Sequence, residues 1–470
     1  MHMTGKTASA AGSWRELLGN HLGATVVLAG GVAIYAINEF ITMSLLPSTV
    51  ADIGGERLYA WVTTVYLVSS VVAATTVGPL LTRFGPRSSY LGALLSFAAG
   101  SALCSAAPSM QLLLVGRVAQ GLAGGVLAGL GYAVISAALP DRLWTRASAV
   151  VSAMWGIGTL VGPATGGLFA QFGFWRGGFG SLAVLAVAMS VLVPIALPAR
   201  TESTGEDPAR TGIPIWSLLL LGMAALAVSA AAIPRNPAVI AGLLAVGLVL
   251  VGTFLVVDRR LKAAVLPRLA FGSGPLKWIY LTLGLLMAAT MVDMYVPLFG
   301  QRLGGLAPIF AGFLGAALSV GWTVGEIASA SITNARRTVQ VVAVAPLVMA
   351  VGLAVAAVTQ NDHASTQLVL VWAAALALTG AGIGMAWPHL SAWAMGSVVG
   401  DPAQQAVAAA AISTVQLMCG AFGAGLAGVV VNLRDTPDVT SSRSMFGLFA
   451  VLAAVGVVAS TRSGRGRVSA

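Results

Sequence analysis

Charged residues are scarce in this chain of 470 residues, where Asp, Glu, Lys and Arg make up only 9%. Soluble domains carry roughly 25%. Hydrophobic residues account for 57% of the chain, and the mean hydropathy is +0.90. Because a water-soluble fold cannot bury so much apolar surface, lipid must solvate most of this chain. The composition therefore excludes a soluble enzyme with a large core.

Residues that build reactive or cross-linked sites are also few. The two cysteines, Cys104 and Cys419, lie inside apolar runs, so we expect packing residues and no disulfide framework. No metal-ligand cluster, phosphate-cradling loop or nucleophile–base pair stands out, so we predict neither an enzyme nor a cofactor. The net charge is +10, but the basic residues are too scattered to predict nucleic-acid binding. Residues 1–20 lack the features of a signal peptide and predict a cytoplasmic tail.

Long apolar runs dominate what is present. A helix needs about 20 apolar residues to cross the hydrocarbon layer, because a lipid-exposed backbone must satisfy its own hydrogen bonds. We identify fourteen such runs, near residues 22–46, 58–80, 88–107, 110–138, 146–170, 178–198, 213–233, 237–257, 277–299, 307–332, 337–358, 366–390, 403–431 and 443–461.

The basic residues support this map through the positive-inside rule. With both termini in the cytoplasm, 18 of the 25 Lys and Arg residues fall in inner loops and tails, and six fall in outer loops. Removing one span would reverse every later loop. We therefore expect a multi-pass protein of the cell membrane with both termini cytoplasmic.

The spans group as six, two and six, which predicts a duplicated transporter with a central site between two bundles. We expect an all-α fold of two pseudo-symmetric six-helix bundles with two extra central helices. The predicted segments are an N-terminal tail at 1–20, a first bundle at 21–199, a cytoplasmic loop at 200–212, a two-helix hairpin at 213–257, a basic linker at 258–276, a second bundle at 277–461 and a C-terminal tail at 462–470.

Three motifs carry a family resemblance. The first is "GPLLTRFGPR", Gly78 to Arg87, which we interpret as a tight turn bearing two cations. It resembles the loop motif of the major facilitator superfamily at Gly78, Leu80, Arg83, Gly85 and Arg87. Thr82 stands where the family has Asp, so the resemblance leaves the family's cytoplasmic latch in doubt here.

The second motif, "LLVGRVAQG", places Arg117 inside the fourth predicted span. It resembles the superfamily pattern at Leu113, Arg117, Gln120 and Gly121, where the Arg is linked to proton transfer. A cation at this depth is costly unless it faces water or a counter-charge. Arg117 is therefore either a fixed cation that tunes a proton-carrying carboxylate or a side chain that snorkels outward.

The third motif, "GTLVGPATGG", fits the pattern of the antiporter branch at Gly158, Gly162, Pro163, Gly166 and Gly167. Glycines at this spacing let a neighbouring helix approach closely, and the proline removes a backbone hydrogen bond. Together with "YAWVTTVYL" and the extra central pair, the motifs resemble the fourteen-helix drug:proton antiporter branch of the superfamily.

Three of the 15 acidic residues fall within spans, namely Glu39, Asp293 and Glu326. Each charge at the bilayer centre costs roughly 2.5–3.5 kcal/mol on insertion scales. A carboxylate avoids this cost by holding a proton, so these groups predict proton coupling. Glu326 is either an inner relay or an interfacial residue.

Glu39 and Asp293 lie in spans that head the two bundles, so both are expected to approach the pathway from opposite halves. The expected substrate-facing residues are Asn38, Glu39, Tyr66, Met291, Asp293, Met294 and Tyr295. The alternative for the Met and Tyr residues is ordinary packing.

Asn38 competes with Glu39 for the pathway-facing position. In the antiporter branch an acid commonly sits nine residues before the proline that is Pro47 here. That position is Asn38, and Glu39 comes one residue later, about 100° around the helix. Glu39 would otherwise hydrogen-bond a neighbouring helix.

The resemblance implies a proton-coupled exporter of lipophilic, cationic small molecules, working by alternating access and driven by the proton gradient without a cofactor. Its expected partners are the substrate, protons and the bilayer, and it is expected to work as a monomer. The alternatives are an exporter of a lipid, siderophore or secreted metabolite on the same fold, and a non-transporting membrane receptor or scaffold.

Overall fold

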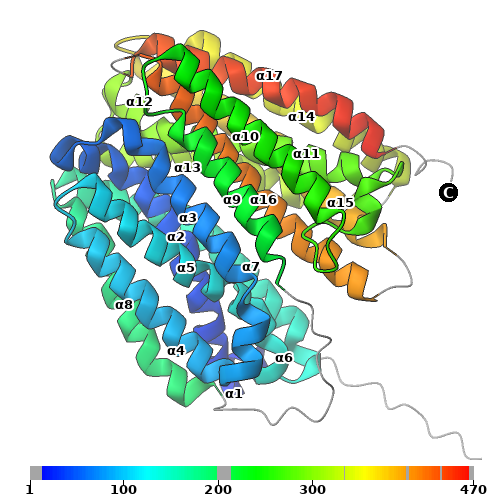
Figure 1. The fold of residues 1–470 in the computed structure, drawn as a ribbon. Helices are drawn as coiled ribbons and strands as arrows, with labels where there is room; N and C mark the ends of the chain where they lie inside the picture. Colours follow the sequence, from blue (N-terminus) through cyan, green and yellow to red (C-terminus); the bar gives the residue numbers. More distant parts are fainter. Residues whose placement is uncertain (1–12, 198–212, 333, 399–401, 435–436, 465–470) are drawn as a thin grey trace, which may run out of the picture.

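The structure is a computed structural model that describes residues 13–197, 213–332, 334–398, 402–434 and 437–464. The predicted loop at 200–212 and most of the two predicted tails lie outside the described residues. The regular structure of the described residues is helical throughout (Figure 1).

The helices that follow the short N-terminal helix α1 (Trp14–Asn20) form an N-terminal half. Here α2 packs on α5, α7 and α8, while α4 packs on α5 and α8. The half consists of α2 (Leu22–Ile53), η1 (Glu56–Leu58), α3 (Tyr59–Ala74), α4 (Val77–Ser105), α5 (Met110–Ala133), α6 (Ile135–Ala138), η2 (Asp141–Leu143), α7 (Trp144–Gln171) and α8 (Trp175–Ala196).

The later helices form a C-terminal half in which α13 and α14 pack on α15, and α17 packs on α11 and α14. It consists of η3 (Arg268–Phe271), α11 (Leu276–Thr290), η4 (Met291–Tyr295), α12 (Val296–Arg302), α13 (Pro308–Ala330), α14 (Ala335–Thr359), α15 (Thr366–Gly396), α16 (Pro402–Asn432) and α17 (Val439–Ser463). Side-chain caps define several helix starts: Asn334 caps α14, Ser365 caps α15, and Asp438 and Ser441 form a capping box at α17.

Between the halves in sequence lies a hairpin of α9 (Ile215–Ala230) and α10 (Pro237–Asp258). Helix α9 packs on α3 of one half and on α16 of the other, and α10 packs on α9 (Figure 1). The indole N–H of Trp61 donates to the carbonyl of Ser229 at 3.0 Å, and the hydroxyls of Thr64 and Ser229 lie 2.8 Å apart. The hairpin therefore covers the boundary between the halves on the α3–α16 side.

Thirteen helices in the described part of the chain are long and apolar enough to cross a membrane. The predicted seventh span, 213–233, corresponds to α9, which has only 16 residues because residues 231–233 turn out of the helix before Pro234. Helix α2 continues past Pro47 to Ile53, seven residues beyond the predicted end of the first span.

The predicted tight turn at Gly78 to Arg87 is narrower than expected, because it is a sharp break at Gly85 with helical residues on both sides. Helix α4 begins at Val77, and the break is confined to Gly85, where φ is 76°. Glycine adopts this backbone conformation without steric cost, and Pro86 restarts the helix with a suitable φ. The helical piece that contains the third predicted span therefore starts after this break, at Pro86, two residues before the predicted residue 88.

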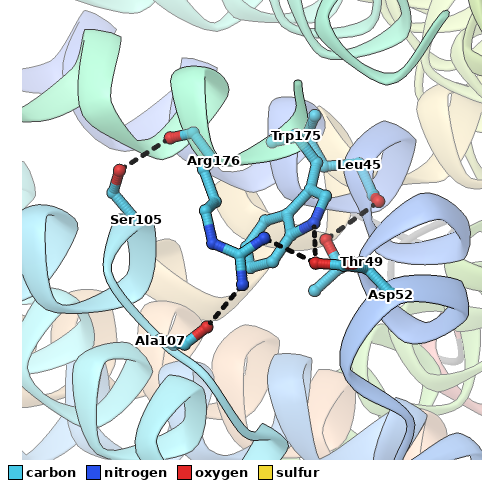
Figure 2. Close-up of polar contacts among 7 residues, drawn as sticks. All are labelled: Leu45, Thr49, Asp52, Ser105, Ala107, Trp175 and Arg176. Atoms are coloured by element: carbon cyan, nitrogen blue, oxygen red, sulfur yellow. Dashed lines mark hydrogen bonds and ion pairs between the residues drawn. The ribbon is translucent and has the colours of Figure 1, made fainter. Parts of the chain in front are cut away.

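We call the end of the molecule that holds α1 and the last turn of α17 the terminal end, and the opposite end the far end. At the far end a polar cluster ties three parts of the N-terminal half together, as Figure 2 shows. The carboxylate of Asp52 on α2 accepts hydrogen bonds from Trp175 and Arg176 of α8 at 3.0 and 2.5 Å. Arg176 also donates to the carbonyl of Ala107 at 3.1 Å, and the Ser105 hydroxyl donates to the carbonyl of Arg176 at 2.8 Å. These bonds hold α2, α4 and α8 as one unit.

Candidate functional site

The guanidinium of Arg117 is the centre of a buried polar network in the N-terminal half. Arg117 is 1% exposed on α5, so it does not snorkel out of the protein. Its Nε donates to the carbonyl of Val62 at 3.1 Å, and its Nη1 donates to Gln120 Oε1 at 2.8 Å. The same Nη1 lies 3.2 Å from Asn38 Oδ1 and 3.3 Å from Thr42 Oγ1 on α2. All of these partners are neutral, so the cation is held by dipoles and not by a bonded counter-ion.

Aromatic rings complete the surroundings of this cation. The Arg117 guanidinium carbon lies 4.2 Å from the ring centroid of Tyr66, a cation–π geometry. Tyr66 stacks on Tyr35 with ring centroids 5.6 Å apart, and Trp155 meets Tyr35 edge-on. Two buried polar groups beside the cation, Tyr66 OH and Asn38 Nδ2, have no hydrogen-bond partner among the described residues. Unmatched buried polar groups are costly, so the polar network around Arg117 is not fully satisfied in this conformation.

Glu39 is half-buried on α2, next to Asn38 but turned away from the Arg117 hydrogen bonds. Helix α2, which carries Glu39, contacts α12 and α13 of the other half. Asn38, the competing residue, is fully buried and bonds Arg117 directly. The two neighbours thus have different surroundings: Asn38 is buried and bonds the cation, whereas Glu39 is half-buried and is not among the groups that bond it.

Asp293 lies in η4, the short 3-10 segment between α11 and α12. It is 6% exposed, and its Oδ1 has no hydrogen-bond partner among the described residues. The opposing residue on α13 is Gly315, where an added methyl group would lie 3.3 Å from that oxygen. A glycine at this position leaves space beside the carboxylate, which a larger side chain would fill.

The other predicted substrate-facing residues of this segment pack against different neighbours from those of Asp293. Met294 is fully buried, and its carbonyl accepts a hydrogen bond from Tyr59 OH at 3.2 Å. Met291 is 4% exposed and lies near Gly420 of α16. Tyr295 stacks on Tyr59 with centroids 4.7 Å apart, at the far end between the halves.

Glu326 lies on α13 towards the terminal end, away from this cluster. It is half-buried, and its Oε2 accepts a hydrogen bond from the indole of Trp322 at 3.2 Å. Trp322 packs on Trp387 of α15 with centroids 5.4 Å apart. His389, two residues after Trp387 on α15, makes a 3.1 Å contact with the carbonyl of Ser329 on α13. The structure therefore does not bring Glu326 together with Glu39 and Asp293.

The glycine motif of α7 has a clear packing role. Methyl groups on Gly158, Gly162 or Gly166 would lie 2.5–2.7 Å from atoms of α2, so these glycines allow close contact within the N-terminal half. Gly167 instead faces α13, where an added methyl group would lie 3.0 Å from the backbone nitrogen of Ile309. The motif thus packs α7 on α2 and also on the other half, near Pro163.

The remaining motif residues lie on α4 and α5. Gly121 faces α3, where an added methyl group would lie 2.5 Å from the carbonyl oxygen of Tyr66. The side chain of Gln120 accepts a hydrogen bond from Arg117 and donates one to the Ser101 hydroxyl at 2.8 Å. The loop-motif residues lie at the terminal end of α4, where Gly78 has open space around it and Arg83 lies over the ring of Phe84. Arg87 follows in the same helix after the break.

Sequence reasoning missed several members of the network. Tyr35 and Thr42 lie one helical turn before Glu39 and one turn after Asn38, so a search at i±4 positions would have found them. Ser101 of α4 carries no sequence signal, because its role depends on a contact between separate helices. In the described part of the chain, no group of three or more His, Cys, Asp or Glu residues could hold a metal ion.

Comparison with known proteins is consistent with this architecture. A model of the Major Facilitator Superfamily matches residues 28–427. A probable multidrug-efflux transporter of Mycobacterium tuberculosis (strain ATCC 25618 / H37Rv) is 62% identical over 458 residues, which cover 97% of both chains. The multidrug transporter protein MdtP of Bacillus subtilis (strain 168) is 24% identical, covering 85% of this chain and 73% of its own.

Solved structures share the fold at low sequence identity. The nucleoside transporter NupG superimposes with a TM-score of 0.66 at 12% identity, covering 95% of this chain and 99% of its own. A D-xylose–proton symporter gives a TM-score of 0.62 at 15% identity, covering 92% and 97%. These findings confirm the predicted all-α membrane fold and its family. The chain belongs to the Major Facilitator Superfamily and is a membrane transporter, not an enzyme.

Proposed function

We propose that this transporter is a proton-driven exporter of lipophilic cations, acting as a multidrug antiporter in the cell membrane. The observation that carries the proposal is the pair of carboxylates Glu39 and Asp293, which come from opposite halves: Glu39 lies on α2, which contacts α12 and α13 across the boundary, and Asp293 is buried in η4 beside α12 with an unpartnered oxygen. The name of the relative that is 62% identical, a multidrug-efflux transporter, supports the same cargo. In this proposal both termini are cytoplasmic, the far end faces outward, and the monomer is the working unit.

In the proposed cycle, a proton and a lipophilic cation compete for the same carboxylates. An unpaired carboxylate in a low-dielectric site is stable only as a neutral acid or beside a cation. A lipophilic cation entering from the cytoplasm takes the place of a proton, which leaves to water on that side. A proton entering from outside then displaces the cation outward and neutralises the carboxylate for the return. Each proton that moves inward supplies about 2.3 kcal/mol per 100 mV.

Arg117 has the role of a fixed positive charge in this cycle. It bonds only neutral groups, so no bonded carboxylate cancels its charge, and that charge can favour loss of the proton from Glu39 in the same half. Hydrogen bonds to α2 and α3 fix the Arg117 side chain, which itself lies on α5. The charge therefore stays in place while protons and substrate exchange.

Contacts between the halves at the far end support alternating access. They include the Tyr59–Tyr295 stack, the Glu56–Arg302 ion pair at 3.1 Å and the close approach of Gly167 to Ile309. These contacts have to separate before the substrate can leave on that side.

Counter-transport in proteoliposomes tests the proposal. With ethidium as substrate, an imposed proton gradient should drive uptake that collapses when the gradient is dissipated. Asp293→Asn and Glu39→Gln should each abolish gradient-driven accumulation, because an amide cannot exchange a proton. Glu16→Gln, which changes a surface carboxylate at the terminal end, is the matched control and should behave as the parent.

Two outcomes would refute the proposal. One is gradient-driven accumulation that persists in both amide variants. The other is a proton flux that an extracted lipid or secreted metabolite produces, while ethidium and other lipophilic cations produce none. The second result would assign the same fold a different cargo.

A further inference from the structure

The α9–α10 hairpin touches both halves of the transporter at the far end. We call residues 229–233, which run from the last turn of α9 into the turn that follows it, the hairpin tip. On one side the hairpin tip meets η1 and α3 of the N-terminal half, and on the other side it meets α16 of the C-terminal half. When the halves separate at the far end, the hairpin tip cannot keep all of these contacts.

Hydrogen bonds join the hairpin tip to the N-terminal half. The indole N–H of Trp61 on α3 donates to the carbonyl of Ser229 at 3.0 Å, and the hydroxyl of Thr64 lies 2.8 Å from that of Ser229. Both hydroxyl-bearing residues are fully buried. Arg57 in η1 donates from Nη1 to the carbonyl of Ile233 at 2.5 Å. Three hydrogen bonds from two elements therefore hold the hairpin tip on the N-terminal half.

Small side chains make most of the contact between the hairpin tip and the C-terminal half. A methyl group added at Gly425 of α16 would lie 2.6 Å from the hydroxyl oxygen of Ser229. One added at Gly428 would lie 3.4 Å from Ala232 Cβ. Val429 of α16 completes a small apolar cluster with the hairpin tip. The two surfaces are therefore close together but mainly in apolar contact.

In the described part of the chain, one side chain of the C-terminal half bonds to the hairpin tip. Asn432 Nδ2, at the end of α16, donates to the carbonyl of Ala232 at 3.1 Å. The same nitrogen lies 3.1 Å from the carbonyl of Arg57, which belongs to the N-terminal half. Asn432 thus bonds to the hairpin tip and to the N-terminal half as to one surface, and both bonds break when α16 moves away.

The surrounding lipid decides which of these contacts lasts. Apolar contacts between helices can be exchanged for contacts with lipid tails, which are equally apolar, so apolar area holds membrane helices together weakly. A buried hydrogen-bonding group that loses its partner in lipid finds no water to replace it. Because the N-terminal half supplies three of the hydrogen bonds and α16 supplies one, the hairpin tip should separate from α16 and not from α3.

We propose that the hairpin moves with the N-terminal half as one unit, and that its tip is a gate element that α16 closes against at the far end. Asn432 and the glycine face of α16 release the hairpin tip when the far end opens. The α3–α16 flank therefore cannot open without breaking this contact. This inference goes beyond the proposed function, because it requires only that the halves separate and not that protons drive them.

Two engineered disulfides in the full-length chain test which half the hairpin follows. Thr64→Cys with Ser229→Cys ties the hairpin tip to α3, where the native hydroxyl oxygens are 2.8 Å apart. Ala232→Cys with Gly428→Cys ties it to α16, where the two Cβ atoms would be 3.4 Å apart, close to the separation of about 3.5–4.5 Å in disulfides. The second pair also carries Ala60→Gly, because Ala60 Cβ would lie 2.5 Å from the new Cβ of residue 428.

Gradient-driven ethidium transport in proteoliposomes is measured for each variant when reduced, when oxidised and after renewed reduction, so each protein is its own control. The disulfide to α3 should leave transport unchanged. The disulfide to α16 should stop transport, and the reductant should restore it. Any other pattern of inhibition would overturn the proposal: loss of transport with the α3 disulfide alone would show that the hairpin follows the C-terminal half. Failure of either disulfide to form would show that the hairpin tip does not lie against both halves.

A second measurement separates this inference from the proton-coupled function, because it needs neither substrate nor a gradient. Single-molecule energy transfer between dyes on unnatural amino acids at Phe172 and Leu433, one in each half and both exposed, reports separation of the far end. The disulfide to α16 should remove the low-transfer population of the reduced protein, and the disulfide to α3 should preserve it. If this pattern holds while ethidium is not transported, the proposed function fails and the role of the hairpin stands. A low-transfer population that survives the α16 disulfide, or that the reduced protein lacks, would refute that role.

Discussion

Adding a single methyl group at Gly167 should shift the conformational equilibrium towards a state with an open far end. In Gly167→Ala the new methyl would come closest to the Cα of Ile309, and it would lie 3.0 Å from the nitrogen of Ile309 and 3.1 Å from the carbonyl oxygen of Pro308. These are backbone atoms of α13, so they cannot move aside by a rotamer change. The contact crosses the boundary between the halves and exists only while the far end is closed.

The magnitude follows from the cost of overpacking, about 1–3 kcal/mol for an inserted methylene. Because about 1.4 kcal/mol is a factor of ten in an equilibrium constant, the ratio of open to closed molecules should rise roughly 5- to 150-fold. Gly162→Ala produces a comparable clash, 2.5 Å from Phe40 Cβ, but within one half. It should lower thermal stability without opening the far end.

Pulsed EPR distances measure this shift directly. Spin labels at Phe172 of the N-terminal half and Leu433 of the C-terminal half, which are 76% and 63% exposed, report separation of the far end. Gly156→Ala is the neutral control, because an added methyl there meets no atom within 4 Å. A parental distance distribution in Gly167→Ala, or an equal lengthening in Gly162→Ala, would show that this contact does not hold the far end closed.

The remaining predictions concern single polar groups. Arg117→Lys should abolish transport while the protein still folds. A lysine ammonium cannot donate at the same time to the Val62 carbonyl and to α2, as the forked guanidinium does. Transport assays measure the first effect, and thermal unfolding measures the second. Asp258→Asn should destabilise the turn after α10 by about 1–3 kcal/mol, because the carboxylate accepts three hydrogen bonds there, and limited proteolysis of the following linker should accelerate. The Arg142 guanidinium lowers the pKa of Glu16 below its ordinary 4.5. This surface pair should therefore be intact above that pH and be lost as the pH falls further, and Glu16→Gln should remove the pH dependence of N-terminal proteolysis.

The helices were predictable because apolar runs of membrane-spanning length have few alternatives. Errors arose where helices continue through residues that usually end them. Pro47 lies inside α2, and the helical turn before Gly85 looked like a loop. In lipid the backbone gains from remaining helical, so charged and proline residues near a helix end predict boundaries less well than in water.

The candidate site was predictable in composition but not in its contacts. Buried carboxylates and Arg117 were evident because charge is rare in spans. Their surroundings depend on which helices touch, which one sequence does not reveal: the bond from Gln120 to Ser101 joins α5 to α4, and Asp293 faces Gly315 of α13. Asp258 was assigned to a linker, whereas it is buried at the end of α10 and bonded to the start of α9. The roles of the individual site residues in transport stay predictions.

The two flanks of the molecule are unequal in their access to lipid. On one flank, α9 lies against both α3 and α16, and Ser229 touches each of them through Thr64 and Gly425. Helix α10 lies outside it with little of its surface buried. On the other flank, α7 meets α13 with no helix of the hairpin over them. A compound dissolved in the bilayer therefore meets the seam between the halves directly at α7 and α13 on this flank, whereas on the opposite flank it meets the hairpin first.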